Sequence, residues 1–341
     1  MIPAGYKSAM DVFSTERCIK FLKDRFEASL ARRLRLRRVT APLCVKCDTG
    51  IQDNLNGVER PVQFPVRGDG DTRYEVVQSL AKWKRLALCN YNFAPGEGIY
   101  TDMNALRPDE DSLDNTHSVY VDQWDWERAI APADRNLDYL KAVVGDIYTA
   151  IKDTEWEMDD NFGMTQFLPE EITFIHTEDL AERYPGAPSQ ERERLACKQH
   201  GAVFFIGIGG ELPDGTIHDG RAPDYDDWTT PTGDGHCGLN GDIFVWNPVL
   251  DMPLELSSMG IRVDAPTMTR QLEIRGCDDR KDLPWHRMLL DGKLPQSVGG
   301  GIGQSRLCML LMKRAHIGEV QVGLWPQEVI DTCRDAGIQL L

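Results

Sequence analysis

The sequence predicts an α+β fold in which helices flank an antiparallel β-sheet. Several short apolar runs follow one another with no helix between them, which favours antiparallel pairing over a doubly wound parallel sheet. Helical periodicity is confined to a few separate segments. The junctions carry no long Gly/Ser linker, so we expect residues 1–341 to form one domain.

Apolar residues spaced three and four apart predict the helices. The first helix is expected after Ser14, with a face formed by Ile19, Leu22, Phe26 and Leu30. Further helices are predicted over residues 137–157, over 178–200 with a break near Pro185 and Pro188, and, as the last one, after Gly303.

Strand-like runs lie between and after these helices. The first covers residues 36–43 and is interrupted by Pro42, which lacks an N–H donor and belongs at an edge, a bend or an interface. The others cover residues 74–77, 118–121, 172–176, 202–208, 243–247 and 260–263.

Composition excludes several classes of protein. No apolar stretch approaches the roughly 18–20 residues that span a bilayer, and we expect no secretory signal. The nine cysteines are an odd number, which suits reduced thiols in the cytoplasm better than disulfides. Cys44 and Cys47 form a lone C-x-x-C, for which ordinary packing is preferred over a metal or redox role. The histidines show no zinc-binding spacing.

A net charge of −16 argues against nucleic acid as a partner. A surface of this sign repels polyanions, whereas a tRNA-binding enzyme collects a basic face. One basic cluster comprises Arg32, Arg33, Arg35, Arg37 and Arg38. An RNA or phosphate contact is one interpretation. A solvated helix end with ion pairs to this acidic chain is the favoured one.

The most distinctive motif is Gly299-Gly-Gly-Ile-Gly-Gln-Ser-Arg306. A Rossmann fingerprint would need a preceding strand, which Pro295 breaks, and a glycine in place of Arg306. Glycines such as Gly301 and Gly303 instead let backbone approach a planar or phosphorylated ligand. An arginine on a first helical turn then meets phosphate with its fork of donors. A glycine-rich turn with a surface arginine is the alternative.

Two further segments present polar groups suited to a small ligand. Arg107 precedes a proline, so it is expected to be extended or in a turn and to project into a cleft. In the strand after it, alternation places Gln123, Asp125 and Glu127 on one face. Such a row of an amide and two carboxylates is costly to bury, but it suits the binding of an ammonium group. A strand face exposed to solvent is the alternative.

Asp242 and Glu255 are candidate ligands for Mg²⁺. They lie on neighbouring apolar strands, and Mg²⁺ reaches protein sites through one or two carboxylates plus substrate phosphates. Ion pairing with arginines is the alternative. The string Gly207-Ile-Gly-Gly210 lacks the lysine of a P-loop and is interpreted as a strand that ends in a turn.

Six strings in family order make the chain resemble the ammonia-dependent aspartate–ammonia ligases and, more distantly, the class II aminoacyl-tRNA synthetases. They are Gln52-Asp-Asn-Leu55, Ser79-Leu-Ala-Lys-Trp-Lys-Arg85, Ala105-Leu-Arg-Pro-Asp-Glu-Asp111, Tyr120-Val-Asp-Gln-Trp-Asp-Trp-Glu-Arg128, Arg221-Ala-Pro-Asp-Tyr-Asp-Asp-Trp228 and residues 299–306. The resemblance implies a synthetase-like sheet in a single catalytic domain, with residues 1–14 as a short extension. It also implies a homodimer, because the segment around Pro42 looks like the synthetase dimer motif.

The resemblance implies that ATP is used to make L-asparagine from L-aspartate and ammonia. In the family's two steps, the β-carboxylate attacks the α-phosphate of ATP to give β-aspartyl-AMP and pyrophosphate, and ammonia then displaces AMP. Adenylation supplies the leaving group that a free carboxylate lacks. The enzyme contributes positioning and charge stabilisation.

Roles carried over residue by residue complete the expected site. Arg107 would span the reacting carboxylate and the α-phosphate, and Asp53 would hold ammonium or take its proton. The ATP phosphates would be held by Arg306, with Mg²⁺ on Asp242 and Glu255. The α-carboxylate of aspartate would meet Lys84, and its α-ammonium would meet Gln123 and Asp125. Weaker candidates for substrate or ATP binding are Asp226, Ser257, Ser258 and Arg262.

Two departures from the family concern the loop near Asp53. The approach Cys47-Asp-Thr-Gly-Ile51 keeps only Gly50, and Gln78 stands where bacterial relatives have histidine. The alternative function is an aspartyl-adenylate-forming enzyme with tRNA or another amine as acceptor. The segment before Pro42 is too short for an anticodon-binding domain. A regulator without catalysis would have lost the arginines and acids, and Ile2 replaces the cysteine that glutamine-dependent synthesis would need.

Overall fold

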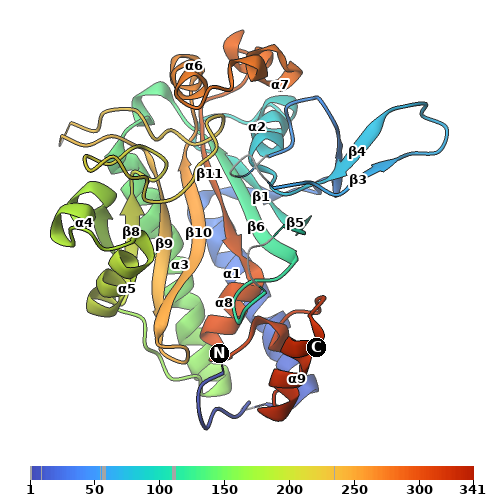
Figure 1. Ribbon diagram of the computed structural model, residues 1–341, viewed down its shortest axis with the longest axis vertical. Coiled ribbons are helices and arrows are strands. Elements are labelled where there is room, and N and C mark those ends of the chain that lie inside the picture. Colours follow the sequence, from blue (N-terminus) through green and yellow to red (C-terminus); the bar gives the residue numbers. More distant parts are fainter. Residues whose placement is uncertain (1, 9, 54, 56–58, 110–112, 234) are drawn as a thin grey trace.

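The computed structural model describes residues 2–8, 10–53, 55, 59–109, 113–233 and 235–341. Its strands form a large and a small sheet (Figure 1). The large sheet contains β1 (Leu36–Arg38), β5 (Gly98–Leu106), β6 (Tyr120–Ala129), β7 (Thr173–His176), β8 (Ala202–Ile206), β9 (Asn240–Asn247), β10 (Met252–Ile261) and β11 (Ser297–Gly303). The small sheet contains β2 (Cys44–Lys46), β3 (Gln63–Pro65) and β4 (Arg73–Val76).

The strand order of the large sheet is β1-β5-β6-β11-β10-β9-β8-β7. The inner pairs are antiparallel, and only the outermost pairs, β1–β5 and β7–β8, are parallel. The predicted α+β class with an antiparallel sheet is therefore confirmed, with parallel pairing added at both edges.

The helices are α1 (Val12–Leu34), α2 (Ala81–Asn90), α3 (Leu137–Phe162), α4 (Thr177–Arg183), α5 (Ser189–His200), α6 (Ala265–Ile274), α7 (Pro284–Leu290), α8 (Gln304–Leu311) and α9 (Gln327–Asp335). Short 3₁₀ turns are η1 (Pro132–Asp134), η2 (Asp278–Asp282) and η3 (Ile317–Glu319). No helix in the described part of the chain is long and apolar enough to cross a membrane.

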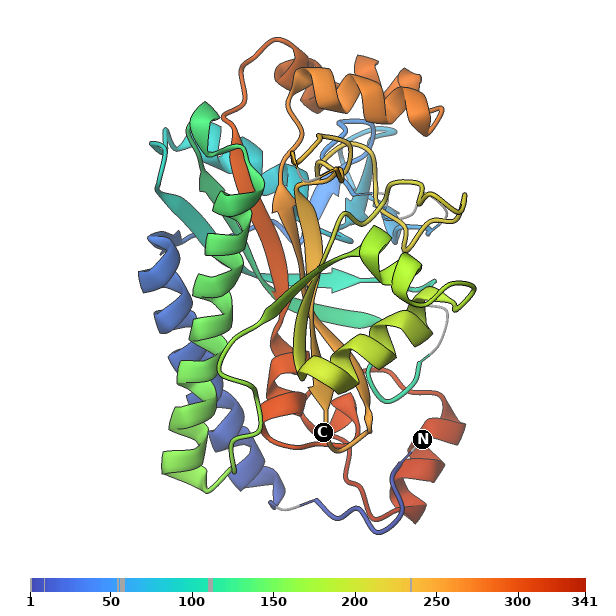
Figure 2. The ribbon, with the colours of Figure 1, turned by 90° about the vertical axis from the view of Figure 1, so that its left-hand side faces the viewer.

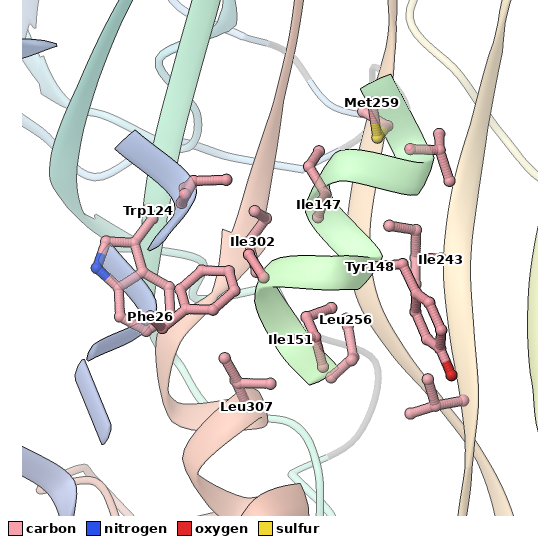
Figure 3. Close-up of a cluster of buried hydrophobic side chains, with 14 of the residues drawn as sticks. Phe26, Trp124, Ile147, Tyr148, Ile151, Ile243, Leu256, Met259, Ile302 and Leu307 are labelled. Carbon is pink, nitrogen blue, oxygen red and sulfur yellow. The ribbon is translucent and has the colours of Figure 1, made fainter. Parts of the chain in front are cut away.

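The two longest helices, α1 and α3, lie side by side against one face of the large sheet (Figure 2). Their apolar faces pack with α8 on the side chains of β6, β9, β10 and β11. Figure 3 shows the centre of this layer, where Phe26 of α1 packs against Trp124 of β6. Their ring centroids are 4.6 Å apart. A smaller cluster joins α4 and α5 to the other face of β8 and β9. Helix α2 packs against β5, β6 and β11.

Several predicted boundaries are confirmed and others are wrong. Asp11, not Ser14, caps α1, because its carboxylate accepts the Ser14 N–H at 3.0 Å. The break near Pro185 separates α4 from α5, as predicted. The helix after Gly303 is not the last, since α9 follows it, and Pro295 does not break a strand: the glycine string is itself the strand β11.

The arginine cluster at the end of α1 is largely ion-paired. Arg33 lies 2.7 Å from Asp153, and Arg38 lies 2.6 Å from Asp102. Arg35 ends the helix in the left-handed region, with φ of 56°. The preferred interpretation of a helix end paired with acids is thereby confirmed.

Candidate active site

A polar cavity of about 610 Å³ lies over the central strands. Its lining comes from β6, β9, β10 and β11, the first turn of α8, and loops around residues 53, 107 and 219–225. Among the predicted site residues, the cavity brings together Asp53, Arg107, Gln123, Asp242, Glu255, Ser257, Ser258, Gly301, Gly303 and Arg306. The remaining ones, Lys84, Asp125, Asp226 and Arg262, are not part of its lining.

A β-bulge in β10 places Glu255 and Ser258 on the same side of the sheet. The pairing with β9 shifts register between Glu255 and Ser257. Before the shift the core-facing residue is Leu256, and after it Met259, three positions later. Because side chains otherwise alternate strictly, only the bulge allows both polar groups to reach the cavity.

Two arginine–carboxylate pairs line the cavity. Arg221 donates to Asp242 at 2.5 Å, and Arg306 lies 3.2 Å from the Glu255 carboxylate. Burial raises the pKa of Asp242 to about 8; Arg221 opposes this effect, and Glu255 and Asp219 add to it. Burial acts in the same direction on Glu255, but Arg306 and Arg221 hold the pKa of that carboxyl below its usual value. Together these acids favour a bound cation.

Arg306 is positioned by an anchor at the start of α8. The Asp122 carboxylate on β6 accepts the Ser305 N–H at 3.0 Å and the Ser305 hydroxyl at 2.8 Å. Lys23 of α1 lies 3.2 Å from the same carboxylate. The first turn of α8 is thus fixed on the sheet, and its arginine points toward Glu255.

The glycines of β11 make room for the polar side chains of β6. In register, β11 glycines lie opposite Gln123, Asp125 and Glu127. A Cβ at Gly301 would stand 2.2 Å from Gln123 Oε1 and 2.6 Å from Asp125 Oδ1, and one at Gly299 would stand 1.9 Å from Glu127 Oε2. The predicted polar side chains of β6 therefore lie opposite glycines of β11.

Lys84 of α2 lies beneath the cavity. Its ammonium donates to the Gly300 carbonyl at 2.8 Å and lies 3.2 Å from Asp125. Burial lowers the pKa of Lys84, while Asp125 opposes that effect. A direct contact with the α-carboxylate stays a prediction. In the structure, Lys84 fixes Asp125 and the glycine strand.

Arg262 also lies beneath the cavity, in a buried ion-pair network. It lies 2.9 Å from Glu127 and pairs with Asp226. Burial opposes its charge, but these two carboxylates raise the pKa of Arg262 well above its usual value. Both acids are ion-paired with this arginine. Asp226 and Arg262 therefore stabilise the structure next to the cavity and do not line it.

Arg107 is held by backbone. Its Nε and Nη2 donate to the Gln78 carbonyl at 3.2 and 3.0 Å. This contact does not depend on the side chain at position 78. Two acids of the same string, Glu110 and Asp111, lie outside the described residues.

Asp53 lies at the buried end of the cavity and is only 1% exposed. Its carboxylate accepts the Leu55 N–H at 2.9 Å and is hydrogen-bonded by Ser79. Burial raises the pKa of Asp53, and Lys82 opposes that effect. The retained Gly50 has a φ of 76°, a conformation that glycine adopts readily.

Sequence reasoning gave no role to several lining residues. Arg221, Asp219 and Tyr225 lie in or beside one of the quoted strings, yet all three line the cavity. The signal available for Arg221 was its place at the start of one of the quoted strings. Its partner Asp242 is 21 positions away, and only the fold joins them.

The fold is that of a class II synthetase-like protein. Its central sheet is antiparallel, and the cavity over this sheet receives one arginine from a loop and another from the helix that follows a glycine-rich strand. The asparaginyl-tRNA synthetase from Pyrococcus horikoshii, in complex with asparaginyl-adenylate, superposes with a TM-score of 0.66. It is 14% identical, and the match covers 92% of this chain and 70% of that one. The aspartyl-tRNA synthetase from Entamoeba histolytica gives a TM-score of 0.59 at 14% identity, over 90% of this chain and 57% of that one.

Sequence comparison then gives the family. Residues 13–337 match the aspartate–ammonia ligase family model. The chain is 53% identical to the aspartate–ammonia ligase of Clostridium tetani, over 100% of this chain and 97% of that protein. The Parabacteroides distasonis enzyme is 52% identical, over 99% and 98%. The chain therefore belongs to the aspartate–ammonia ligase family and is a ligase that makes asparagine from aspartate and ammonia.

Proposed function

We propose that this ligase works in the 610 Å³ cavity through β-aspartyl-AMP and releases AMP and pyrophosphate. The observation that carries this proposal is the convergence of Arg107 and Arg306 with the acid pair Asp242 and Glu255 on one cavity that ends at Asp53. Cations and acids at one end suit a nucleotide phosphate. A buried carboxylate at the other end suits ammonium.

In the first step, an oxygen of the β-carboxylate attacks the α-phosphorus of ATP, and the bond to the pyrophosphate oxygen breaks. Arg107 stabilises both anions as they approach, because its planar fork can donate to two oxygens at once. Arg306 binds the outer phosphates. Gln123 lies beside Gly301, and its amide oxygen accepts a hydrogen bond from the substrate's α-ammonium. Asp125 lies beside the same glycine and adds a negative charge.

The donor set fits Mg²⁺. The described residues contain no group of three or more metal-ligating side chains, but Asp242 and Glu255 supply the one or two carboxylates that Mg²⁺ takes alongside substrate phosphates. Burial is the main cause of the raised pKa of Asp242, and the neighbouring carboxylates of Glu255 and Asp219 add to it. When bound, Mg²⁺ would neutralise phosphate charge.

In the second step, ammonia attacks the β-carbonyl carbon and the bond to the AMP oxygen breaks. Attack needs NH₃, although ammonium prevails in neutral solution, so a proton must leave inside the site. Asp53 binds the ammonium and accepts this proton. Its pKa is raised by burial, which makes it a better proton acceptor than an exposed carboxylate.

Asp53→Asn separates the two steps. We expect asparagine formation to fall by about 10²-fold or more, because the amide neither attracts ammonium nor accepts a proton. Aspartate-dependent exchange of pyrophosphate into ATP should fall by less than about tenfold. Asp109→Asn is the control, because Asp109 lines the same cavity but is paired with the exposed Arg60. An equal loss in both assays for Asp53→Asn would remove it from the ammonia step.

Asp242→Asn tests the metal assignment. The change leaves Glu255 as the single carboxylate of the pair, so the Mg²⁺ concentration for half-maximal pyrophosphate exchange should rise by about tenfold or more. Asp251→Asn, an exposed acid in the turn after β9, is the control. An unchanged Mg²⁺ requirement in Asp242→Asn would contradict the assignment.

One assay tests the reaction itself. The protein is incubated with aspartate, ATP, Mg²⁺ and either ammonium or glutamine, and asparagine, AMP, ADP and pyrophosphate are measured. Formation of asparagine, AMP and pyrophosphate with ammonium supports the proposal. Release of ADP would contradict the adenylate route, and AMP without asparagine would indicate another acceptor, such as tRNA.

We further propose that residues 1–341 act as one catalytic domain and pair as a homodimer in the cytoplasm. The support for pairing is the resemblance of α1, β1 and Pro42 to the synthetase dimer motif. β1 is an edge strand of the large sheet, and Leu43, which follows Pro42, is 56% exposed. An edge strand with an exposed apolar neighbour is a surface that a second subunit can cover.

A further inference from the structure

A buried cluster of charges lies behind Asp53, outside the cavity lining. The Lys82 ammonium lies 3.0 Å from Asp224 Oδ2, and the same oxygen lies 2.9 Å from His286 Nε2 and 3.3 Å from Arg280. Lys82 is 1% exposed, and Asp224 and His286 are 0% exposed. Such a cluster is costly to assemble away from water, so its placement against a reactive carboxylate calls for a reason.

The cluster and Asp53 are fixed by the same helix. Trp285 of α7 donates its N–H to the Thr49 carbonyl at 3.0 Å and its indole N–H to the Lys82 carbonyl at 2.9 Å. A Cβ on Gly50 would stand 2.7 Å from His286 Nδ1. The loop that carries Asp53 and the first turn of α2, where Lys82 lies, are therefore both held by α7.

An ionised Asp53 balances the charges of this cluster. Burial lowers the pKa of His286, so it contributes no charge at neutral pH. Burial alone would raise the pKa of Asp224, but Lys82 and its other partners hold it well below its usual range. Lys82 and Arg280 therefore carry two positive charges against one on Asp224. Ionised Asp53 supplies the second negative charge.

Few other groups act on Asp53. Among the residues that the structure describes, the titratable or charged groups that act on Asp53 are Lys82 from α2, and Asp224 and Tyr225 from the loop before β9. Burial raises the pKa of Tyr225 well above its usual value, so it stays neutral. Lys82 is the strongest influence that favours the ionised form of Asp53, and Asp224 acts against it.

We propose that Lys82 is a positioning residue for the ammonia step, which keeps Asp53 ionised in its buried position, and that Asp224 anchors Lys82 there. The proposal rests on the proposed role of Asp53 in binding ammonium and accepting its proton. Adenylation does not use Asp53, so Lys82 matters for that step only through the fold.

The test is the pH dependence of two reactions in Lys82→Met. Without the cation, Asp53 requires a higher pH to ionise, so the acid limb of asparagine formation should move to higher pH by about one unit, or about tenfold in rate below the limb. Pyrophosphate exchange should change by less than about threefold. Profiles are compared at one total ammonium concentration, so the ammonia equilibrium in solution is common to all variants.

Two variants serve as controls. Lys82→Arg retains the charge and should keep the limb near its original position. Lys281→Met removes a cation of η2 that pairs with Asp278 and Glu273, and it should leave both reactions unchanged. A Lys82→Met enzyme that is slower at every pH, with an unmoved limb, would overturn the proposal.

Two outcomes keep this proposal separate from that for Asp53. If Asp53→Asn loses both reactions equally and retains the acid limb, the role of Asp53 is wrong whatever Lys82 does. If Lys82→Met does not fold, Lys82→Met/Asp224→Asn removes the ion pair as a unit. The acid limb of asparagine formation in the double variant should still move to higher pH, because Lys82 influences the pKa of Asp53 more strongly than Asp224 does. An unmoved limb in the double variant counts against the proposal.

Discussion

Replacing Arg107 by alanine is expected to lower aspartate-dependent pyrophosphate exchange by about 10³-fold while the fold is retained. Within the part of the chain that the structure describes, Arg107 makes no ion pair, and its donors meet only the Gln78 carbonyl. Arg221 and Arg306, by contrast, are each paired with an acid. The Arg107 guanidinium is therefore the cation in the cavity best placed to meet the reacting carboxylate and phosphate.

Two comparisons make the Arg107 result interpretable. Arg107→Lys keeps the charge but loses the planar fork, so it should recover less than about a tenth of the exchange rate. Arg334→Ala on α9 removes an exposed arginine paired with Asp331 and should change nothing. Thermal unfolding of all variants reports the fold. Retained exchange in Arg107→Ala would refute its role.

Gly301→Ala is the second change with a large expected effect. The new Cβ would stand 2.2 Å from Gln123 Oε1 and 2.6 Å from Asp125 Oδ1, closer than any real contact. Both side chains must shift, and Asp125 is held by Lys84. We expect about 1–3 kcal/mol lower stability from overpacking. Exchange activity should fall by about 10²-fold, because the α-ammonium contacts are displaced.

Gly145→Ala on α3 is the matched control for the same chemical change. A Cβ at Gly145 meets nothing within 4 Å, and the position is helical. This variant should be more stable by about 0.5–1 kcal/mol and fully active. Denaturant unfolding and the exchange assay check both variants. If Gly301→Ala matches Gly145→Ala in activity, the β6 side chains do not depend on the glycine strand.

The polar face of β6 could be predicted from the sequence because alternation is a local property of a strand. Trp124 and Trp126 pack into the core, and Gln123, Asp125 and Glu127 occupy the other face, as the two-residue period requires. The first helix was equally accessible, since its apolar residues mark the face that meets the sheet.

The glycine strand could not be predicted in the same way. Glycine disfavours strands, so local preference indicates a turn at residues 299–303. The reason for Gly299 and Gly301 is the β6 side chains beside them, which lie more than 170 positions earlier in the chain. The membership of the lining was equally hidden: nothing in the sequence shows that Gln123 reaches the cavity while Lys84 lies outside its lining.

Central strand β11 limits how this active site can change over evolution. At Gly299, Gly300 and Gly301 an added Cβ would stand less than 3.0 Å from a neighbouring atom, so no side chain can be introduced there without displacing another. These three positions of β11 therefore cannot change one at a time without loss of the present packing. New acceptors or substrates are more readily accommodated by the loops around residues 53, 107 and 219–225, which also line the cavity. Divergence among relatives with different chemistry is therefore expected in those loops, over an unchanged sheet.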